Sequence, residues 1–318
     1  MTKTYTGKKV AIFTDAHALL EPVEAALDDI KKRGITEIYS LGDNIGDGPD
    51  PLGVLKALQD NGVKSIAGNA EEYITLGIDP FISYMEKRKK EVERTRKLIG
   101  EEGKRIISTY SHSYELFLGG KKIGLCHFGN DVRIDFDVHS TWSYQSHFDL
   151  MGTGERFNSQ ASKQFEYTAS KEQIERIREI GTGDRASISY YGGYLSAYNE
   201  PMFPTGQPGI GKKLTVFDDV FQGHVHFKLE DPTEQTNYHT LRAVGMGYRN
   251  DPINTASYVI LNEFIDQETG KKGFDIEEVL VEFDREKMIY KVINDTTLDS
   301  RMIIFTSATP EEINKFRR

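Results

Sequence analysis

The chain has 318 residues, of which 38% are apolar and 28% are charged, and its formal net charge is −9. This composition predicts a globular protein with a sizeable core, and the negative charge argues against general nucleic-acid binding, which needs a basic surface, while leaving a local basic pocket open. The one cysteine, Cys126, excludes an internal disulfide and a cysteine-ligated zinc site. The polar amino terminus predicts no signal peptide and no apolar run is long enough to predict a membrane span, so we expect a cytoplasmic location.

The first half of the chain alternates short apolar runs with helical patterns, which predicts a sheet whose strands are joined by crossing helices. Apolar residues three and four apart predict two helices, one opened by Pro22 and ended by Gly34, the other ended by Gly62. Strands are expected at residues 10–13, 38–41 and 63–66.

Each of these three strands ends in a loop with a side chain that can bind a metal ion. Asp15 and His17 follow the first strand, Asp43 follows the second and Asn69 follows the third. Taken alone, each residue also fits a turn or a helix N-cap. Because ligands bind beyond the carboxyl ends of strands in α/β sheets, we expect the four side chains to converge on one site.

The second half of the chain repeats this pattern. A charged helix is expected at 84–99, followed by strands at 121–126 and 216–221. The first of these strands runs into His127 and the second into Gly-His-x-His, which contains His224 and His226. Carboxylate, amide and imidazole ligands in this mixture suit a divalent transition metal.

Two further regions bear on the domain organisation. Residues 138–213 are rich in Tyr, Ser and Gly, and they read either as an insertion that caps the site or as a surface excursion. Segments 240–244, 257–262 and 274–283 read as antiparallel strands that complete a second sheet, and Thr309 to Glu312 reads as a capping box. We therefore expect a single domain over 1–318.

These motifs resemble the calcineurin-like metallophosphoesterase superfamily over about residues 8–285, and in particular bacterial diadenosine tetraphosphate hydrolases and related phosphoesterases of the protein phosphatase 2A-like group. The matching patterns are Asp-x-His, Gly-Asp, Gly-Asn, an isolated His after a strand and Gly-His-x-His. The resemblance implies an α/β fold, a four-layer α/β/β/α sandwich of two mixed β-sheets flanked by helices. The residues that carry it are Asp15, His17, Asp43, Asn69, His127, His224 and His226.

The resemblance also implies a dinuclear site. One metal would take Asp15, His17 and His226. The other would take Asn69, His127 and His224, with Asp43 bridging both. Such N and O ligands suit Mn or Fe, with Zn or Co as alternatives, and a hydroxide bridging ions ~3.5–4 Å apart would attack phosphorus in line with the leaving group. Asp43, Asn69 and His224 are the residues expected to take part in catalysis.

One position departs from the superfamily pattern. Ala70 stands where the third motif usually has a histidine that assists the leaving group. General acid help is worth ~10²–10⁴ in rate, so its loss favours substrates with good leaving groups, such as nucleotide phosphoanhydrides. His112, His139 or His147 could replace it, although each also fits a surface or structural role.

Three functions follow from these observations. The leading one is a metal-dependent phosphohydrolase acting on a nucleotide phosphoanhydride or phosphodiester, such as diadenosine tetraphosphate. A serine/threonine protein phosphatase is an alternative that Ala70 disfavours, and a non-catalytic binding scaffold is one for which Ala70 is the support. The expected partner is a small phosphate ester or nucleotide, with no membrane and no general nucleic-acid binding.

Overall fold

The computed structural model describes residues 2–68, 70–71, 74, 83–111, 113–127, 217–224, 226, 228–232, 237–246, 254–298 and 308–317. The predicted insertion at 138–213 lies outside the described residues, as do Asn69, His112, His139 and His147. Within the described ranges, no helix is both long enough and apolar enough to cross a lipid bilayer.

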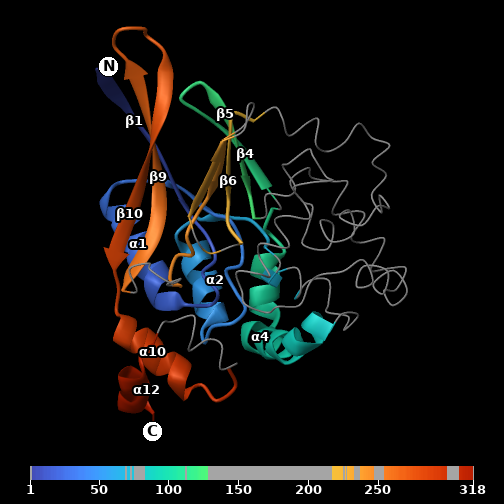
Figure 1. Cartoon of the computed structure of the whole chain (residues 1–318). Helices are drawn as coiled ribbons and strands as arrows, with labels where there is room; N and C mark the ends of the chain where they lie inside the picture. The colour runs from blue at the N-terminus through green and yellow to red at the C-terminus, as the bar shows by residue number, and fades with distance from the viewer. Residues whose placement is uncertain are drawn as a thin grey trace, which may run out of the picture.

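Ten strands form the two sheets of the described part. They are β1 (Lys3–Phe13), β2 (Glu37–Ser40), β3 (Lys64–Ser65), β4 (Ser113–Leu118), β5 (Lys121–Cys126), β6 (Asp219–Gln222), β7 (Leu229–Pro232), β8 (Asn237–Thr240), β9 (Thr255–Asp266) and β10 (Lys272–Glu282). The first sheet has the order β10-β9-β1-β2-β3 and the second the order β4-β5-β6-β8-β7 (Figure 1). Both are mixed. In the first sheet β1, β2 and β3 run parallel beside the antiparallel pair β9 and β10, and in the second β5, β6 and β8 run parallel between the antiparallel strands β4 and β7.

The end of β1 shows how the two layers are held together. Successive side chains of a strand point to opposite faces, so the four residues before the first candidate loop serve two cores. Ala11 and Phe13 pack with the helices, whereas Val10 and Ile12 pack against the second sheet. All four are at most 1% exposed. The carboxyl end of β1 is therefore fixed from both sides.

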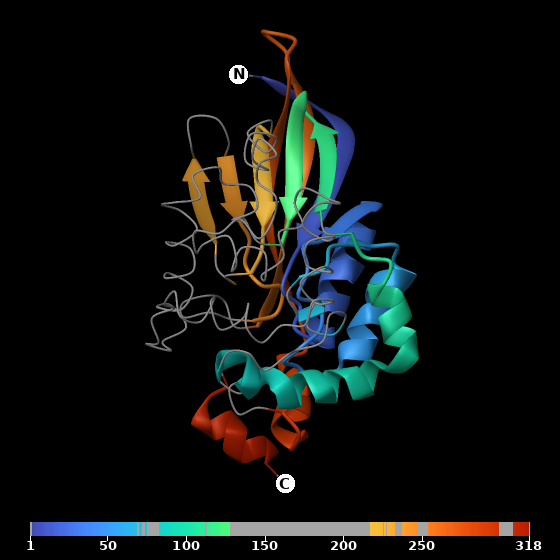
Figure 2. The same cartoon turned by 90° about the vertical axis from the view of Figure 1, so that its right-hand side faces the viewer.

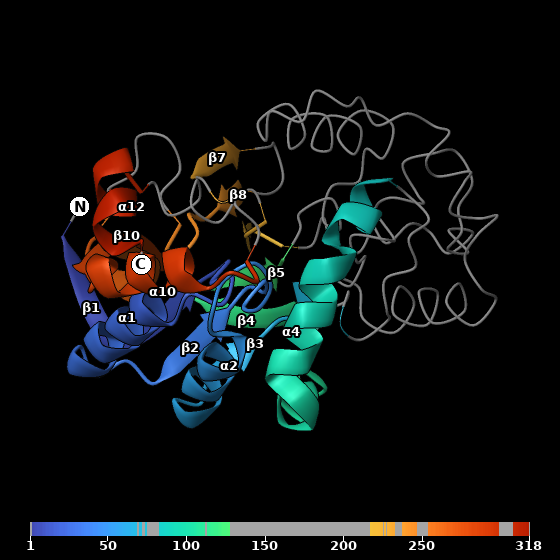
Figure 3. The ribbon, with the colours of Figure 1, turned by 90° about the horizontal axis from the view of Figure 1, so that it is seen from below.

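Five helices are described: α1 (Leu20–Lys32), α2 (Pro51–Asp60), α4 (Ser83–Ile107), α10 (Arg285–Asn294) and α12 (Pro310–Phe316). Helices α1 and α2 bury their apolar faces against the first sheet, as their sequence periodicity predicts (Figure 2). Helix α4 lies beside α2, and α10 and α12 pack together near the carboxyl terminus (Figure 3). The capping box of Thr309 and Glu312 opens α12 as expected.

The predicted α/β architecture of two mixed β-sheets flanked by helices is confirmed. In the described part, helices pack on one face of the first sheet and the second sheet packs on the other. In Figure 2 the strands of the second sheet lie in front of those of the first. A helix layer outside the second sheet is not among the described residues.

Two of the three strands predicted after residue 239 form as antiparallel strands, but they lie in the other sheet. Segments 257–262 and 274–283 belong to β9 and β10 of the first sheet, because β9 pairs with β1, for example Ile12 with Val259. Partners so far apart in the chain leave no local pattern that would assign them to a sheet. The same pairing extends β1 back to Lys3 through the polar amino-terminal residues.

The third predicted strand, 240–244, was wrong in place, because only Thr240 lies in a strand, as the last residue of β8. Strand β8 comes earlier and contains the polar residues Asn237 and His239. Asn237 Nδ2 donates to Asp219 Oδ1 at 3.2 Å and His239 Nε2 lies 3.0 Å from the same oxygen. Because the polar side chains of β8 are satisfied by a buried aspartate, this strand lacks the apolar pattern by which strands are usually found.

Candidate metal centre

Four loops that carry candidate ligands meet at one end of the two sheets. These loops follow β1, β2, β5 and β6, and main-chain hydrogen bonds join them in pairs. His17 N donates to Asp43 O at 2.8 Å, and Gly223 N donates to His127 O at 3.0 Å. The structure thus brings together the six predicted ligands that it describes, while Asn69 lies outside the described residues.

The backbone of these loops is unusual. Five of the six described candidates have positive φ angles: Asp15 (54°), His17 (44°), Asp43 (50°), His224 (72°) and His226 (66°). In the described part of the chain, Ala18 is the only other non-glycine residue with such an angle. A non-glycine residue in this region costs ~1–3 kcal/mol, and such strain gathers at functional sites. The strained backbone therefore coincides with the proposed site.

The first group of ligand atoms comes from Asp15, His17 and His226. The two histidine Nε2 atoms lie 2.9 Å apart, and Asp15 Oδ1 lies 3.4 Å from that of His226 and 3.7 Å from that of His17. Ligand atoms held about 2.1 Å from one metal ion lie about 3.0–3.4 Å apart, so two of the three distances match a common ion and the Asp15–His17 distance of 3.7 Å is somewhat longer. All three side chains are buried.

The two oxygens of Asp15 have different surroundings. Oδ2 accepts hydrogen bonds from Thr14 Oγ1 at 2.8 Å and from His224 N at 2.9 Å. Oδ1 is buried and accepts no hydrogen bond from the residues described here. Burial of a carboxylate oxygen that accepts no hydrogen bond is costly, and the cost is offset by a bound cation or, without metal, by the charge of the protonated His17 imidazole 3.7 Å away. Asp15 therefore fits a metal ligand whose second oxygen is held by the protein.

The second group comes from Asp43, His127 and His224. His224 Nδ1 lies 3.3 Å from His127 Nε2, which lies 3.5 Å from Asp43 Oδ1. Asp43 Oδ2 points the other way, 3.8 Å from His17 Nε2. The two oxygens of Asp43 thus face different groups, as a bridging ligand requires.

The far nitrogens of His17 and His127 face different partners. His127 Nδ1 lies 2.7 Å from Leu41 O, which can only accept, so Nδ1 carries the proton and Nε2 is left to bind a metal. His17 Nδ1 faces the buried carboxylate of Asp47, with Oδ2 3.5 Å away. Asp47 is not among the residues predicted for the site, although its place four residues after Asp43 in the same loop is a signal that could have indicated it.

The charges of the two groups are strongly coupled. Burial alone would lower the pKa of His17, but Asp15, Asp43 and Asp47 outweigh it and raise the pKa to about 9. Burial is likewise outweighed at His127, where Asp43 and Asp15 raise the pKa to about 10. The pKa values of Asp15 and Asp43 are lowered despite burial, mainly by the neighbouring histidines. Without metal, both groups therefore pair carboxylates with protonated imidazoles.

Two motif glycines permit the close approach of these loops. A Cβ at Gly42, whose φ is 98°, would lie 2.7 Å from Gly68 N and 2.9 Å from His127 Nδ1. A Cβ at Gly223 would collide with the side chains of Thr14 and Asp15. Glycine is therefore required at both positions for steric reasons.

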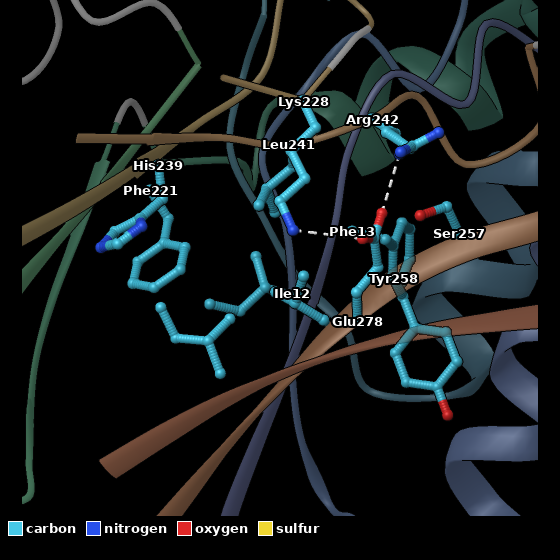
Figure 4. Close-up of a pocket in the computed structure, with 12 residues that line it drawn as sticks. Ile12, Phe13, Phe221, Lys228, His239, Leu241, Arg242, Ser257, Tyr258 and Glu278 are labelled. Carbon is cyan, nitrogen blue, oxygen red and sulfur yellow. Dashed lines mark hydrogen bonds and ion pairs between the residues drawn. The ribbon is translucent and has the colours of Figure 1, made fainter. Parts of the chain in front are cut away.

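A pocket between the sheets is separate from this centre (Figure 4). Residues of β1, β6, β8, β9 and β10 line it, and Glu278 pairs there with Arg242 at 2.8 Å and with Lys228 at 3.2 Å. None of the six described candidate ligands is among its lining residues.

Comparisons with known proteins give weak similarities. No protein-family model matches the chain. An uncharacterized protein of Methanocaldococcus jannaschii, MJ0912, is 30% identical over 118 residues, which cover 37% of this chain and 48% of the relative. The chain thus matches about half the length of that relative.

Solved structures with similar folds include two that align over nearly their full length. The hypothetical protein PH1004 from Pyrococcus horikoshii OT3 has a TM-score of 0.49 at 16% identity, covering 98% of each chain. A metallophosphoesterase from Sphaerobacter thermophilus also has a TM-score of 0.49, at 14% identity, covering 94% of this chain and 98% of that one. These similarities are too weak to transfer an activity, so the chemistry has to come from the side chains of this chain.

Proposed function

We propose that the protein is a dinuclear metal-dependent phosphohydrolase. The observation that carries the proposal is the pair of buried Asp/His groups that meet at Asp43, whose two oxygens face different groups. Asp15, His17 and His226 would hold one ion, and His127 and His224 would hold the other. Asn69, which follows β3 in sequence, completes the second set in the proposal.

Two bound transition-metal ions would supply a nucleophile at neutral pH and neutralise the phosphate oxygens. The chain contributes the geometry for this chemistry. Buried imidazoles carry no charge as ligands, so they add donors without cancelling the positive charge that attracts phosphate. The inter-loop hydrogen bonds hold the ligands before substrate arrives, so little reorganisation is needed at the moment of reaction.

The proposed substrate class rests on the absence of an acidic side chain at position 70. Ala70 is 5% exposed and its main-chain N–H donates to Asp43 Oδ1 at 2.7 Å, so this position adjoins the candidate centre but carries no acid. A leaving group that is stable as an anion needs no proton, whereas an alkoxide does. We therefore propose a nucleotide phosphoanhydride or phosphodiester, such as diadenosine tetraphosphate, as the substrate class.

A substrate panel with the Mn-loaded protein tests the proposal. It contains diadenosine tetraphosphate, cyclic nucleotides, bis-p-nitrophenyl phosphate and a phosphoserine peptide. We expect turnover of the first three classes to exceed that of the peptide, and aryl diesters to lose rate steeply as the leaving-group pKa rises. No turnover of any nucleotide or diester would contradict the proposal, and preferential peptide hydrolysis would favour a protein phosphatase.

A further inference from the structure

Glu71 is a fully buried carboxylate that lies beneath the candidate centre, and its side chain is 0% exposed. Its Oε2 accepts hydrogen bonds from Asp43 N at 3.0 Å and Gly68 N at 2.8 Å. Its Oε1 accepts from Asn44 N at 2.9 Å and Ile45 N at 3.3 Å. One side chain thus holds four main-chain donors from the loops that follow β2 and β3.

Burying a carboxylate is strongly unfavourable unless hydrogen-bond donors surround it. Successive main-chain N–H groups aimed at one point form such an anion cradle. Here the cradle is formed by residues 43–45, the segment in which Asp43 adopts its strained φ of 50°. The carboxylate therefore stabilises a backbone conformation that the loop would not adopt by itself.

The side chain of Asp43 is held from the same segment as Glu71. Ala70 N donates to Asp43 Oδ1 at 2.7 Å, so residues 70 and 71 fix both the carboxylate and the main chain of Asp43. The two oxygens of Glu71 bind different main-chain groups. Oε2 links the loop after β2 to the loop after β3, and Oε1 binds two N–H groups of the loop after β2. Loss of Oε2 would remove the link between the loops, and loss of Oε1 would remove the two hydrogen bonds within the loop after β2.

We infer that Glu71 is the positioning residue that holds Asp43 between the two metal groups. This inference rests on the proposed dinuclear function and assigns Glu71 no contact with metal or substrate. Glutamine cannot replace it, because its amide NH₂ would face two N–H donors whichever way the group turns. Aspartate is one methylene too short to reach both loops.

The test compares Glu71→Gln with Glu263→Gln. Glu263 is a matched control because it is 7% exposed and also accepts a main-chain hydrogen bond, from Gly119 N at 3.0 Å, but none of the six described candidates is among its hydrogen-bond partners. Purified metal-free proteins are titrated with Mn²⁺, and binding is followed by electron paramagnetic resonance alongside Tm. We expect Glu71→Gln to weaken Mn²⁺ binding by ~10–100-fold and to lower kcat with little change in KM, as removal of an outer-sphere partner does. Glu263→Gln should lower Tm but bind Mn²⁺ as wild type does.

Equal Mn²⁺ affinity in Glu71→Gln and wild type would overturn the inference, whereas failure of wild type to bind two ions would overturn the proposed function instead. Glu71→Asp is read by the same criteria if the glutamine variant does not fold. Amide hydrogen exchange on metal-free wild type needs no variant. The N–H groups of Asp43, Asn44 and Gly68 should be protected, and fast exchange at all three would also contradict the inference.

Discussion

The two Asp/His groups converge on Asp43 but differ in what lies behind their imidazoles. In the first group, His17 Nδ1 faces the carboxylate of Asp47 at 3.5 Å. In the second, His127 Nδ1 donates to the main-chain carbonyl of Leu41 at 2.7 Å. An imidazole whose far nitrogen faces a carboxylate is more basic, and so binds a metal ion more strongly, than one whose far nitrogen is hydrogen-bonded to a carbonyl.

The groups also differ in charge. The first group has a carboxylate of its own, Asp15. In the described part of the second group the carboxylate is Asp43, which also faces the first group. Negative ligands bind cations more tightly, so the first group should fill first and hold its ion longer. The comparison indicates that equal ligand numbers need not give equal sites.

The largest effect is expected from Asp43→Asn, which removes the charge common to both groups. We expect metal content to fall from two ions per chain to one or none, and hydrolysis to fall by ~10³-fold or more. Elemental analysis and a bis-p-nitrophenyl phosphate assay measure both. Asp219→Asn, which changes a buried aspartate paired with His239, is the control that should keep two ions.

Single-histidine variants test the two ligand groups separately. His226→Ala should empty the first group and His224→Ala the second, each lowering activity by ~10²–10³-fold through the loss of one ion. The retained ion should dissociate more slowly in His224→Ala, where the first group is intact. Dissociation into a chelator measures the rates, and the opposite order would refute the assigned inequality.

Proton release tests the charge coupling of both groups. His17 and His127 have pKa values of about 9 and about 10 without metal, so both are protonated at pH 7 and a metal must displace both protons. Calorimetry in buffers of different ionisation enthalpy should find about two protons released, with apparent affinity rising from pH 7 toward pH 9. Metal binding without proton release would contradict the expected charges.

The same pKa shifts predict that the stability of the metal-free protein falls as pH rises, whereas the apparent metal affinity rises. A histidine whose pKa is raised on folding stabilises the fold fully below its ordinary value of 6.5, and this contribution is lost as pH rises through about 9 to 10. The Tm of metal-free protein should therefore fall between pH 7 and pH 10. A flat Tm over that range would show that these ion pairs do not contribute.

The smallest effect is expected from Asp47→Asn, which tests how far Asp47 accounts for the difference in metal affinity between the two groups. It weakens the polarisation of His17 without removing a ligand, so binding of the first ion should weaken by ~10-fold and binding of the second should not change. Competitive titration with a metal indicator resolves the two affinities. A uniform loss at both would show that Asp47 acts on the fold as a whole.

Much of the fold could be predicted because its signals are local. The apolar face of α1, the strand before Asp15 and the capping box of α12 are each encoded within a few residues. The partner of β1 could not be predicted, because β9 is joined to it only by pairing across the length of the chain. Strand β8 was missed because its polar side chains are satisfied by Asp219 rather than by water.

The candidate centre shows the same division. Six side chains predicted to lie behind strands do lie together, because the carboxyl ends of neighbouring strands share one edge. Their roles as ligands stay predictions, as does that of Asn69. Asp47 and the hydrogen bonds of Glu71 depend on how the loop after β2 folds back, and residue spacing alone does not indicate that path.

A crystal structure of the protein grown with manganese, with anomalous scattering used to locate the ions, tests the central claim most directly. We expect two manganese ions ~3.5–4 Å apart, with Asp43 bound to both. A structure in which Asp43 contacts no ion, or in which a single ion occupies the centre at saturating manganese, would contradict the dinuclear assignment.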